Sequence, residues 1–156
     1  MDTVRTLYLP LCTHGVVVPM ANVAEITAND VALGRTAPED ECAPEWFLGS
    51  VPWRGRMLPL CAFETMVGSA YASPGHRGRI AVLHGLTCRS ALPFIGFVIQ
   101  ASPNVVIASS TSVNWIGGHS GEDGSQYTAG WVDAGGYEGW IPALEAIECE
   151  LMEALS

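Results

Sequence analysis

Apolar residues along this chain fall in short runs that are separated by glycine, proline and polar residues. Some runs alternate with polar positions, as residues 4–12 do, and others are continuous but short. Many of these positions hold β-branched or aromatic side chains, which pack well on a pleated surface. The pattern therefore predicts a mainly β fold, with strands over residues 4–12, 16–18, 46–51, 57–61, 80–83, 92–99, 105–108, 131–132 and 140–141.

Helices are expected in three places only. Residues 23–26 predict a single helical turn, and one or two further turns are expected before Gly68. A closing helix is expected after Pro142, because the missing N–H of proline is not needed in the first turn of a helix. One face of that helix is predicted to dock and the other to expose acid: the apolar stripe is Leu144, Ile147, Leu151 and Leu155, and the acidic positions are Glu145, Glu150 and Glu153.

Residues 44–68 are the most informative stretch. Two apolar runs flank the basic turn Arg54, Gly55 and Arg56, which is typical of a β-hairpin with a tight glycine-containing turn. Residues 27–43, 69–78 and 109–125 are predicted to be loops. The acidic group in the first loop is interpreted as solvated surface, with a patch that faces a partner as the alternative.

The hairpin stretch is loosely repeated near the end of the chain. When Pro59 is aligned with Pro142, each proline follows a strand, a glycine-rich turn and a second strand, and each precedes a helix. Two related halves, at about residues 4–68 and 79–156, are therefore predicted within a single domain of residues 1–156. Chance similarity in a chain rich in glycine and tryptophan is the alternative. The basic tip of the first copy has no counterpart in the second.

Composition narrows the range of functions. The chain has 156 residues, of which 49% are hydrophobic and 15% charged, so it is long enough and apolar enough to bury a core. It carries 16 Asp and Glu, seven Arg and no Lys, for a net charge of −9. Such a surface repels nucleic acid and anionic membranes. No secretory signal and no apolar run long enough to span a membrane is recognised, so a cytoplasmic protein without direct membrane insertion is expected.

Motifs for catalysis or for cofactor binding are missing from the sequence. No phosphate-binding glycine loop or nucleophile elbow occurs, the four histidines are scattered, and the five cysteines are expected to be free and mostly buried thiols. We therefore expect no catalytic residue, no cofactor and no metal site. An enzyme whose site is assembled from distant residues remains the main alternative, and an OB-like nucleic-acid binder is a weaker one.

Several stretches, read together and in order, resemble the CheW-like domain family. LYLPLCTHGVVVPMANVAEI, at residues 7–26, is similar to the opening of these domains, and GSVPWRGRMLPLCAF, from residue 49, is similar to their central Arg-Gly motif. RIAVLHG and LPFIGFVIQ fit later strands. Within the family the likeness is greatest to the ChpC-type accessory adaptors of the chemosensory system that controls type IV pilus twitching motility.

The resemblance implies a mainly β fold of two packed five-stranded SH3/OB-like β-barrel subdomains with short helices and a C-terminal helix. It also implies a non-catalytic adaptor that couples methyl-accepting chemoreceptor tips to a CheA-like histidine kinase. The functional arginine of the family falls on Arg54, followed by Gly55. Two positions depart from the family pattern: Pro52 stands where Asn is usual and Ala62 where Asp is usual, which favours an accessory role over the standard one.

The expected interaction site follows from the hairpin and from the edges of small barrels. Arginine and tryptophan are favoured anchors in protein interfaces. An arginine on a turn with an internal carboxylate partner is the alternative explanation for Arg54. The predicted partner-binding residues are Trp53, Arg54, Gly55, Arg56, Val17, Met57 and Leu58.

Overall fold

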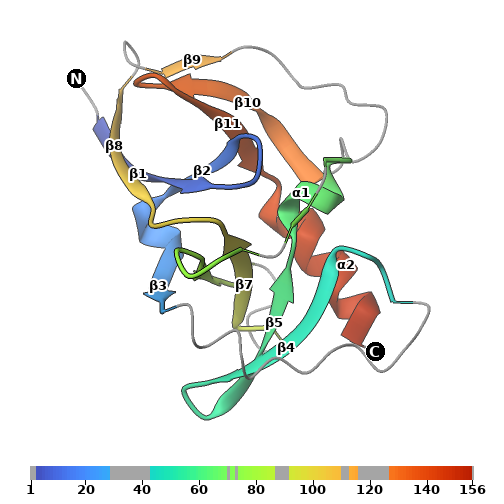
Figure 1. The fold of residues 1–156 in the computed structure, drawn as a ribbon. Coiled ribbons are helices and arrows are strands. Elements are labelled where there is room, and N and C mark those ends of the chain that lie inside the picture. The colour runs from blue at the N-terminus through green and yellow to red at the C-terminus, as the bar shows by residue number, and fades with distance from the viewer. Residues whose placement is uncertain are drawn as a thin grey trace.

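The structure is a computed structural model. It describes residues 3–28, 43–69, 71–72, 74–86, 92–109 and 127–155, together with the backbone of 113–115. Within these residues the chain folds into two β-sheets, three short to medium helices and their connections (Figure 1). The predicted mainly β fold with two packed β subdomains and a C-terminal helix is confirmed.

The first sheet takes its strands from both ends of the chain. Its order is β8-β1-β2-β11-β10-β9, and all neighbours are antiparallel except β2 and β11. The sixth strand of this sheet is β9, which has three residues and pairs with β10. It lies within residues 109–125, which are predicted to be a loop. The strands are β1 (Thr3–Pro10), β2 (Gly15–Pro19), β8 (Asn104–Ser109), β9 (Val113–Trp115), β10 (Thr128–Ala134) and β11 (Tyr137–Pro142).

The second sheet is built from the middle of the chain. Its order is β3-β6-β7-β5-β4, and all neighbours are antiparallel except β7 and β5. The strands are β3 (Val23–Thr27), β4 (Phe47–Trp53), β5 (Arg56–Cys61), β6 (Arg79–His84) and β7 (Phe94–Ile99). Among the described residues, neither ladder of backbone hydrogen bonds closes on itself into a barrel.

The two sheets repeat one topology. In each, a hairpin pairs in parallel with one strand of an antiparallel set of three: β10–β11 joins β2, and β4–β5 joins β7. Each hairpin is also followed at once by a helix, α1 (Phe63–Met66) after β5 and α2 (Leu144–Leu155) after β11. The loose repeat seen in the sequence therefore corresponds to two hairpins in equivalent places. The wider correspondence of residues 4–68 with 79–156 stays a prediction.

Continuous apolar runs arise because many strands are buried on both faces. In β6, Ala81 and Leu83 enter a core shared by the two sheets and α2, whereas Ile80 and Val82 enter a smaller cluster inside the second sheet. In β2, Val17 faces a third cluster, within the first sheet, and its neighbours face the shared core. The largest cluster thus lies between the two subdomains and holds them together by apolar burial.

One predicted helix is wrong. Residues 23–26 form strand β3, and the helical turn lies just before it as the 3₁₀ helix η1 (Met20–Asn22). The β-branched residues of β3 pair with β6, and this tertiary pairing decides against a local helix. The apolar stripe of α2 is confirmed at three positions that are buried, but Leu155 is 46% exposed because it lies at the end of the helix.

Candidate functional site

The β4–β5 hairpin ends in a two-residue turn. Trp53 pairs with Arg56 across the strands, and Arg54 and Gly55 between them have φ angles of 46° and 76°. A type I′ turn requires positive φ at both central positions, and its twist matches that of the strands it joins. Gly55 adopts this backbone without strain, whereas Arg54 is the only non-glycine residue with positive φ in the described part of the chain. The hairpin extends below the rest of the second sheet in Figure 1.

Glu25 of β3 ties this tip to the opposite edge of the same sheet. Its Oε2 accepts a hydrogen bond of 2.8 Å from the indole N–H of Trp53, and its Oε1 lies 2.6 Å from Nη2 of Arg54. These two donors, the indole first, hold the pKa of Glu25 below its ordinary value. The strands β3 and β4 are the two edges of this sheet and do not pair through their backbones. The side chains of Glu25, Trp53 and Arg54 connect these two edges instead.

Aromatic and cationic side chains form a series of pairwise contacts at the base of the tip. The guanidinium of Arg54 lies 4.8 Å from the ring centre of Trp53, and Trp53 meets Phe94 of β7 edge to face at 4.8 Å. The guanidinium of Arg56 lies 5.2 Å above Phe94. The two arginines are therefore held by neighbouring rings, which limits the directions in which they point.

The predicted site residues separate into exposed and buried groups. Arg54, whose side chain is 62% exposed, lies at the surface with Gly55, Arg56 and Met57. Trp53 is only 6% exposed, and Leu58 and Val17 are also buried. The surface that the hairpin offers to a partner thus consists of the turn and the start of β5, and Trp53 acts on it through Glu25 and Arg54. The internal carboxylate partner considered for Arg54 is present.

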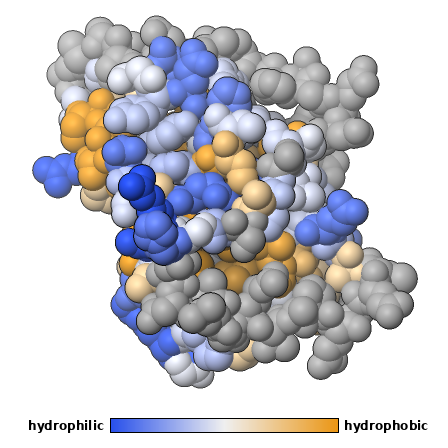
Figure 2. Space-filling view, in the orientation of Figure 1, coloured by the Kyte–Doolittle hydropathy of each residue, from blue (hydrophilic) through white to orange (hydrophobic). Residues whose placement is uncertain are grey.

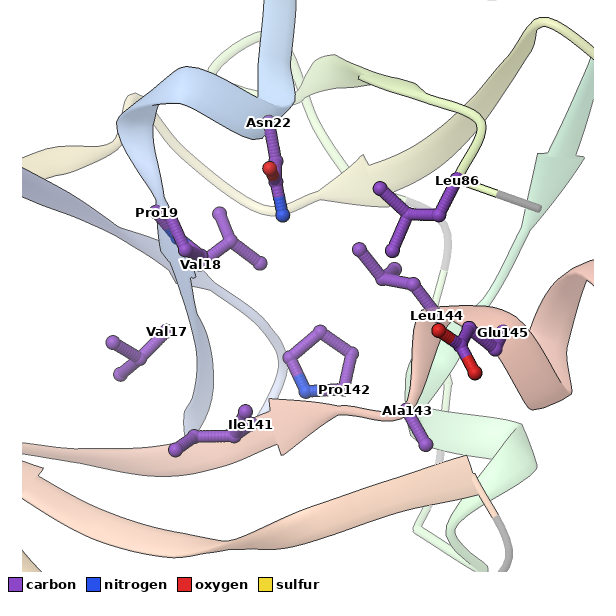
Figure 3. A pocket seen from close by; sticks show the side chains of 10 residues that line it. All are labelled: Val17, Val18, Pro19, Asn22, Leu86, Ile141, Pro142, Ala143, Leu144 and Glu145. Carbon is purple, nitrogen blue, oxygen red and sulfur yellow. The ribbon is translucent and has the colours of Figure 1, made fainter. Parts of the chain in front are cut away.

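A groove between the two subdomains forms a second candidate surface. It encloses about 350 Å³ and lies between β2, β11 and the start of α2, with Pro142 at its floor (Figure 3). The lining is mainly apolar, with the amide of Asn22 and the carboxylate of Glu145 as its polar groups: it comprises Val17, Val18, Pro19, Asn22, Leu86, Ile141, Pro142, Ala143, Leu144 and Glu145. Val17 belongs to this groove, so the structure does not bring it together with the hairpin residues.

The two departures from the family pattern have visible local effects. Pro52 lies exposed on the edge strand β4, where its missing N–H removes no bond to a neighbouring strand. Ala62 occupies the N-cap of α1 and offers no side-chain hydrogen bond to the helix. An aspartate at this position could cap the orphan N–H groups, whereas alanine gives the start of α1 no such support.

Sequence reasoning missed two glutamates. Glu25 lies in residues 23–26, where a helical turn is predicted. Its place in VAEI, at the end of the stretch that is similar to the opening of CheW-like domains, is the signal that could have found it. Glu148 of α2 is buried and accepts a hydrogen bond from the backbone N–H of Leu86, at the rim of the groove. Because Glu148 lies four residues after Leu144, it shares the apolar stripe of the helix, and a polar residue on such a stripe is the signal that could have found it.

An exposed apolar patch lies away from both surfaces. Val105 and Ile107 of β8 are 60% and 50% exposed, and Val4 of the neighbouring β1 is exposed as well. Figure 2 shows apolar surface at the left, over the place of β1 and β8 in Figure 1. Apolar patches on a protein surface often belong to contacts with other molecules.

Neither a membrane-spanning helix nor a metal site is found among the described residues. No helix there is long and apolar enough to cross a membrane, and no three His, Cys, Asp or Glu side chains are grouped closely enough to hold a metal ion.

Of the cysteines described, Cys61 is buried but Cys12 and Cys149 are exposed, so most of these are not the buried thiols expected. Cys12 follows the end of β1, and Cys149 lies on the solvent side of α2. Cys42 and Cys88 lie outside the described residues.

Comparison with known proteins gives one informative result. No protein-family model matches the chain, and no curated protein matches it. Among solved structures, the scaffolding protein TtCheW from Thermoanaerobacter tengcongensis matches with a TM-score of 0.72 and 14% sequence identity, over 92% of this chain and 86% of that one. The chain therefore has the fold of that CheW protein.

Proposed function

We propose that this protein is a non-catalytic adaptor that resembles CheW and couples chemoreceptor signalling tips to a histidine kinase. Within that role we place it with the accessory adaptors of type IV pilus twitching systems, as the ChpC-type resemblance and the changes at Pro52 and Ala62 suggest. The fold shared with a CheW scaffolding protein supports the general role. The observation that carries the proposal is Arg54, exposed at the tip of the hairpin but held in place by Glu25 and Trp53.

A preorganised arginine suits binding because less side-chain freedom is lost when a partner docks. Glu25 fixes one nitrogen of the guanidinium, and the remaining N–H groups of this largely exposed side chain can donate to a partner. The groove beside Val17 offers a second, apolar surface. Two surfaces on one small domain allow two partners to bind at once, so that individually weak contacts produce a firm assembly.

The first test measures how Arg54→Ala binds a chemoreceptor signalling-tip fragment and the kinase of the same system. We expect the Kd for at least one partner to rise by about tenfold or more, as for an interface anchor. Arg77→Ala is the matched control, because Arg77 is exposed in a separate turn and its loss changes net charge equally. Unchanged affinity in a folded Arg54→Ala variant would remove the basis of the proposal.

The second test follows amide hydrogen exchange when the same partners are added. Exchange should slow in residues 16–18, beside the groove, and in residues 57–61, beside the hairpin tip. Binding to either surface limits local opening and excludes water from these amides. Protection confined to the part of α2 beyond Glu145, which does not line the groove, would place the interface elsewhere.

A further inference from the structure

The second arginine of the hairpin differs from the first in having no acidic partner within the part of the chain that the structure describes. Arg56 is exposed, and the described residues contain no carboxylate paired with it; Arg54 alone forms an ion pair on this hairpin. The contact described for the Arg56 guanidinium is with the face of Phe94. On a chain with a net charge of −9, a guanidinium that is held against a ring and has no paired carboxylate among the described residues attracts an anionic group.

Arg56 stands at the rim of an apolar hollow. The hollow encloses about 300 Å³ and is lined by Ser50, Arg56, Met57, Pro59, Leu92, Pro93, Phe94 and Leu155. Met57 is 54% exposed and Leu155 46% exposed, so two flexible apolar side chains from distant parts of the chain face solvent in one place. Met57 and Leu155 can adjust to an incoming side chain, because both are unbranched at Cβ and lie at the surface.

The size and lining select the kind of ligand. Pockets for small molecules span roughly 300–1,000 Å³, so this hollow is at the lower limit and has room for one or two side chains. We propose that it binds a protein segment in which an apolar side chain stands next to an Asp or Glu. The apolar side chain fills the hollow, and the carboxylate draws the Arg56 guanidinium from Phe94 into a charge-assisted pair.

Such a pair is favoured because a guanidinium meets a carboxylate through two parallel hydrogen bonds, whereas its contact with an exposed ring is weaker. A nucleic acid would bring many phosphates against the acidic surface and would leave Met57 and Leu155 in water. The inference rests on the proposed adaptor role, because an adaptor binds other proteins and the ligand is therefore taken to be a protein segment. It concerns Arg56, whose guanidinium contacts Phe94, whereas that of Arg54 contacts Trp53.

The test uses a phage-displayed library of random peptides, selected on the full chain. Enriched peptides are synthesised, and their Kd values are measured with the wild-type protein, with Arg56→Gln and with Leu155→Ser. Arg54→Gln is the matched control, since it removes the other cation of the same hairpin. The ¹³C-labelled methyl group of Met57 reports by NMR whether a peptide enters the hollow.

We expect enriched peptides that share an apolar residue beside Asp or Glu, shift the Met57 methyl signal and bind Arg56→Gln about tenfold more weakly. Replacing the peptide carboxylate by its amide should remove the difference between wild type and Arg56→Gln. Failure to enrich any peptide, equal binding to Arg56→Gln, or an unmoved Met57 signal would each overturn the inference. If these peptides bind as expected while Arg54→Ala leaves receptor and kinase binding unchanged, the hollow stands and the adaptor role falls.

Discussion

The hairpins β4–β5 and β10–β11 hold equivalent places in their sheets but differ at their tips. Each pairs in parallel with an inner strand and leads directly into a helix. The second tip, Gly135-Gly136, closes on its own strand, because Asp133 accepts a 2.8 Å hydrogen bond from the N–H of Gly136. The first tip instead reaches across its sheet to Glu25. A repeated framework therefore supports both hairpins, and only the first presents cations that are fixed from outside the hairpin.

The largest predicted loss of stability comes from the parallel strand pairs, in which β11 pairs with β2 and β5 pairs with β7. A Cβ on Gly139 of β11 would lie 2.4 Å from the carbonyl oxygen of Gly15, so Gly139→Ala must push backbone apart. A Cβ on Gly96 of β7, at the equivalent contact, would meet Leu60 Cδ2 at 2.8 Å, the end of a side chain that can move. We expect Gly139→Ala to lower the free energy of unfolding by about 3 kcal/mol or more and Gly96→Ala by about 1–2 kcal/mol.

Denaturant unfolding of both variants checks this difference. If both variants lose the same free energy of unfolding, or Gly96→Ala loses more, then the close backbone contact between Gly139 and Gly15 does not decide the cost of an added Cβ. A folded mutant with unchanged m-value is required, so that the comparison concerns the native state.

The parts of this structure that the sequence predicts are those fixed by local pattern. Neighbouring residues are enough to predict three of these parts: the hairpin with its turn at Arg54-Gly55, the strand Gly15–Pro19, which ends at its proline, and the apolar stripe of α2. The helical turn predicted at residues 23–26 is wrong because a four-residue segment is too short to show a clear period, and pairing with β6 makes it a strand.

The parts that local pattern does not fix are the long-range contacts of the site. Glu25 and Arg54 are 29 positions apart, and nothing in either segment indicates that β3 and β4 become the two edges of one sheet. The burial of Trp53 depends on Phe94 of β7 in the same way. The hairpin was therefore found as a site, but its buried and exposed members could not be separated before the fold was known.

The helices that follow the two hairpins supply the next comparison. Each buries one glutamate. Glu148 of α2 accepts a hydrogen bond from Leu86, whereas the carboxyl oxygens of Glu64 in α1 make no hydrogen bond of full geometry among the described residues, and the nearby Cys12 offsets the effect of burial on Glu64 only in part. The same substitution should therefore act in opposite directions. Glu148→Leu leaves the backbone N–H of Leu86 without its acceptor and should lower stability by about 1–3 kcal/mol. Glu64→Leu removes a buried carboxyl group that is only weakly compensated and should leave stability unchanged or raise it.

The response to pH separates these two sites further. Burial raises the pKa of Glu64. A raised pKa in the folded state gives stability that is full below the ordinary glutamate pKa and is lost as pH rises through the raised value. Stability curves measured against pH should thus show a fall that Glu64→Leu removes. A fall of the same size in wild type and Glu64→Leu would show that another group causes it.

The smallest predicted effect concerns the tip that distinguishes the first hairpin. The Arg54–Glu25 pair is exposed to solvent, so Arg54→Ala should change the free energy of unfolding by only about 0–1 kcal/mol, and less at high salt. The lowered pKa of Glu25 gives a contribution that is present above the ordinary glutamate pKa and is lost as pH falls through the lowered value.

NMR titration of the Glu25 side chain measures which donor maintains that shift. Trp53→Phe removes the indole N–H, which is the larger cause, and should move the pKa of Glu25 further toward its ordinary value than Arg54→Ala does. If Arg54→Ala alone restored the ordinary pKa, the indole bond would not hold the carboxylate. Arg54 would then be held by a freely moving partner, and the two tips would differ in charge alone. A partial shift instead means that Trp53, buried in the sheet, fixes the carboxylate that in turn orients the exposed arginine.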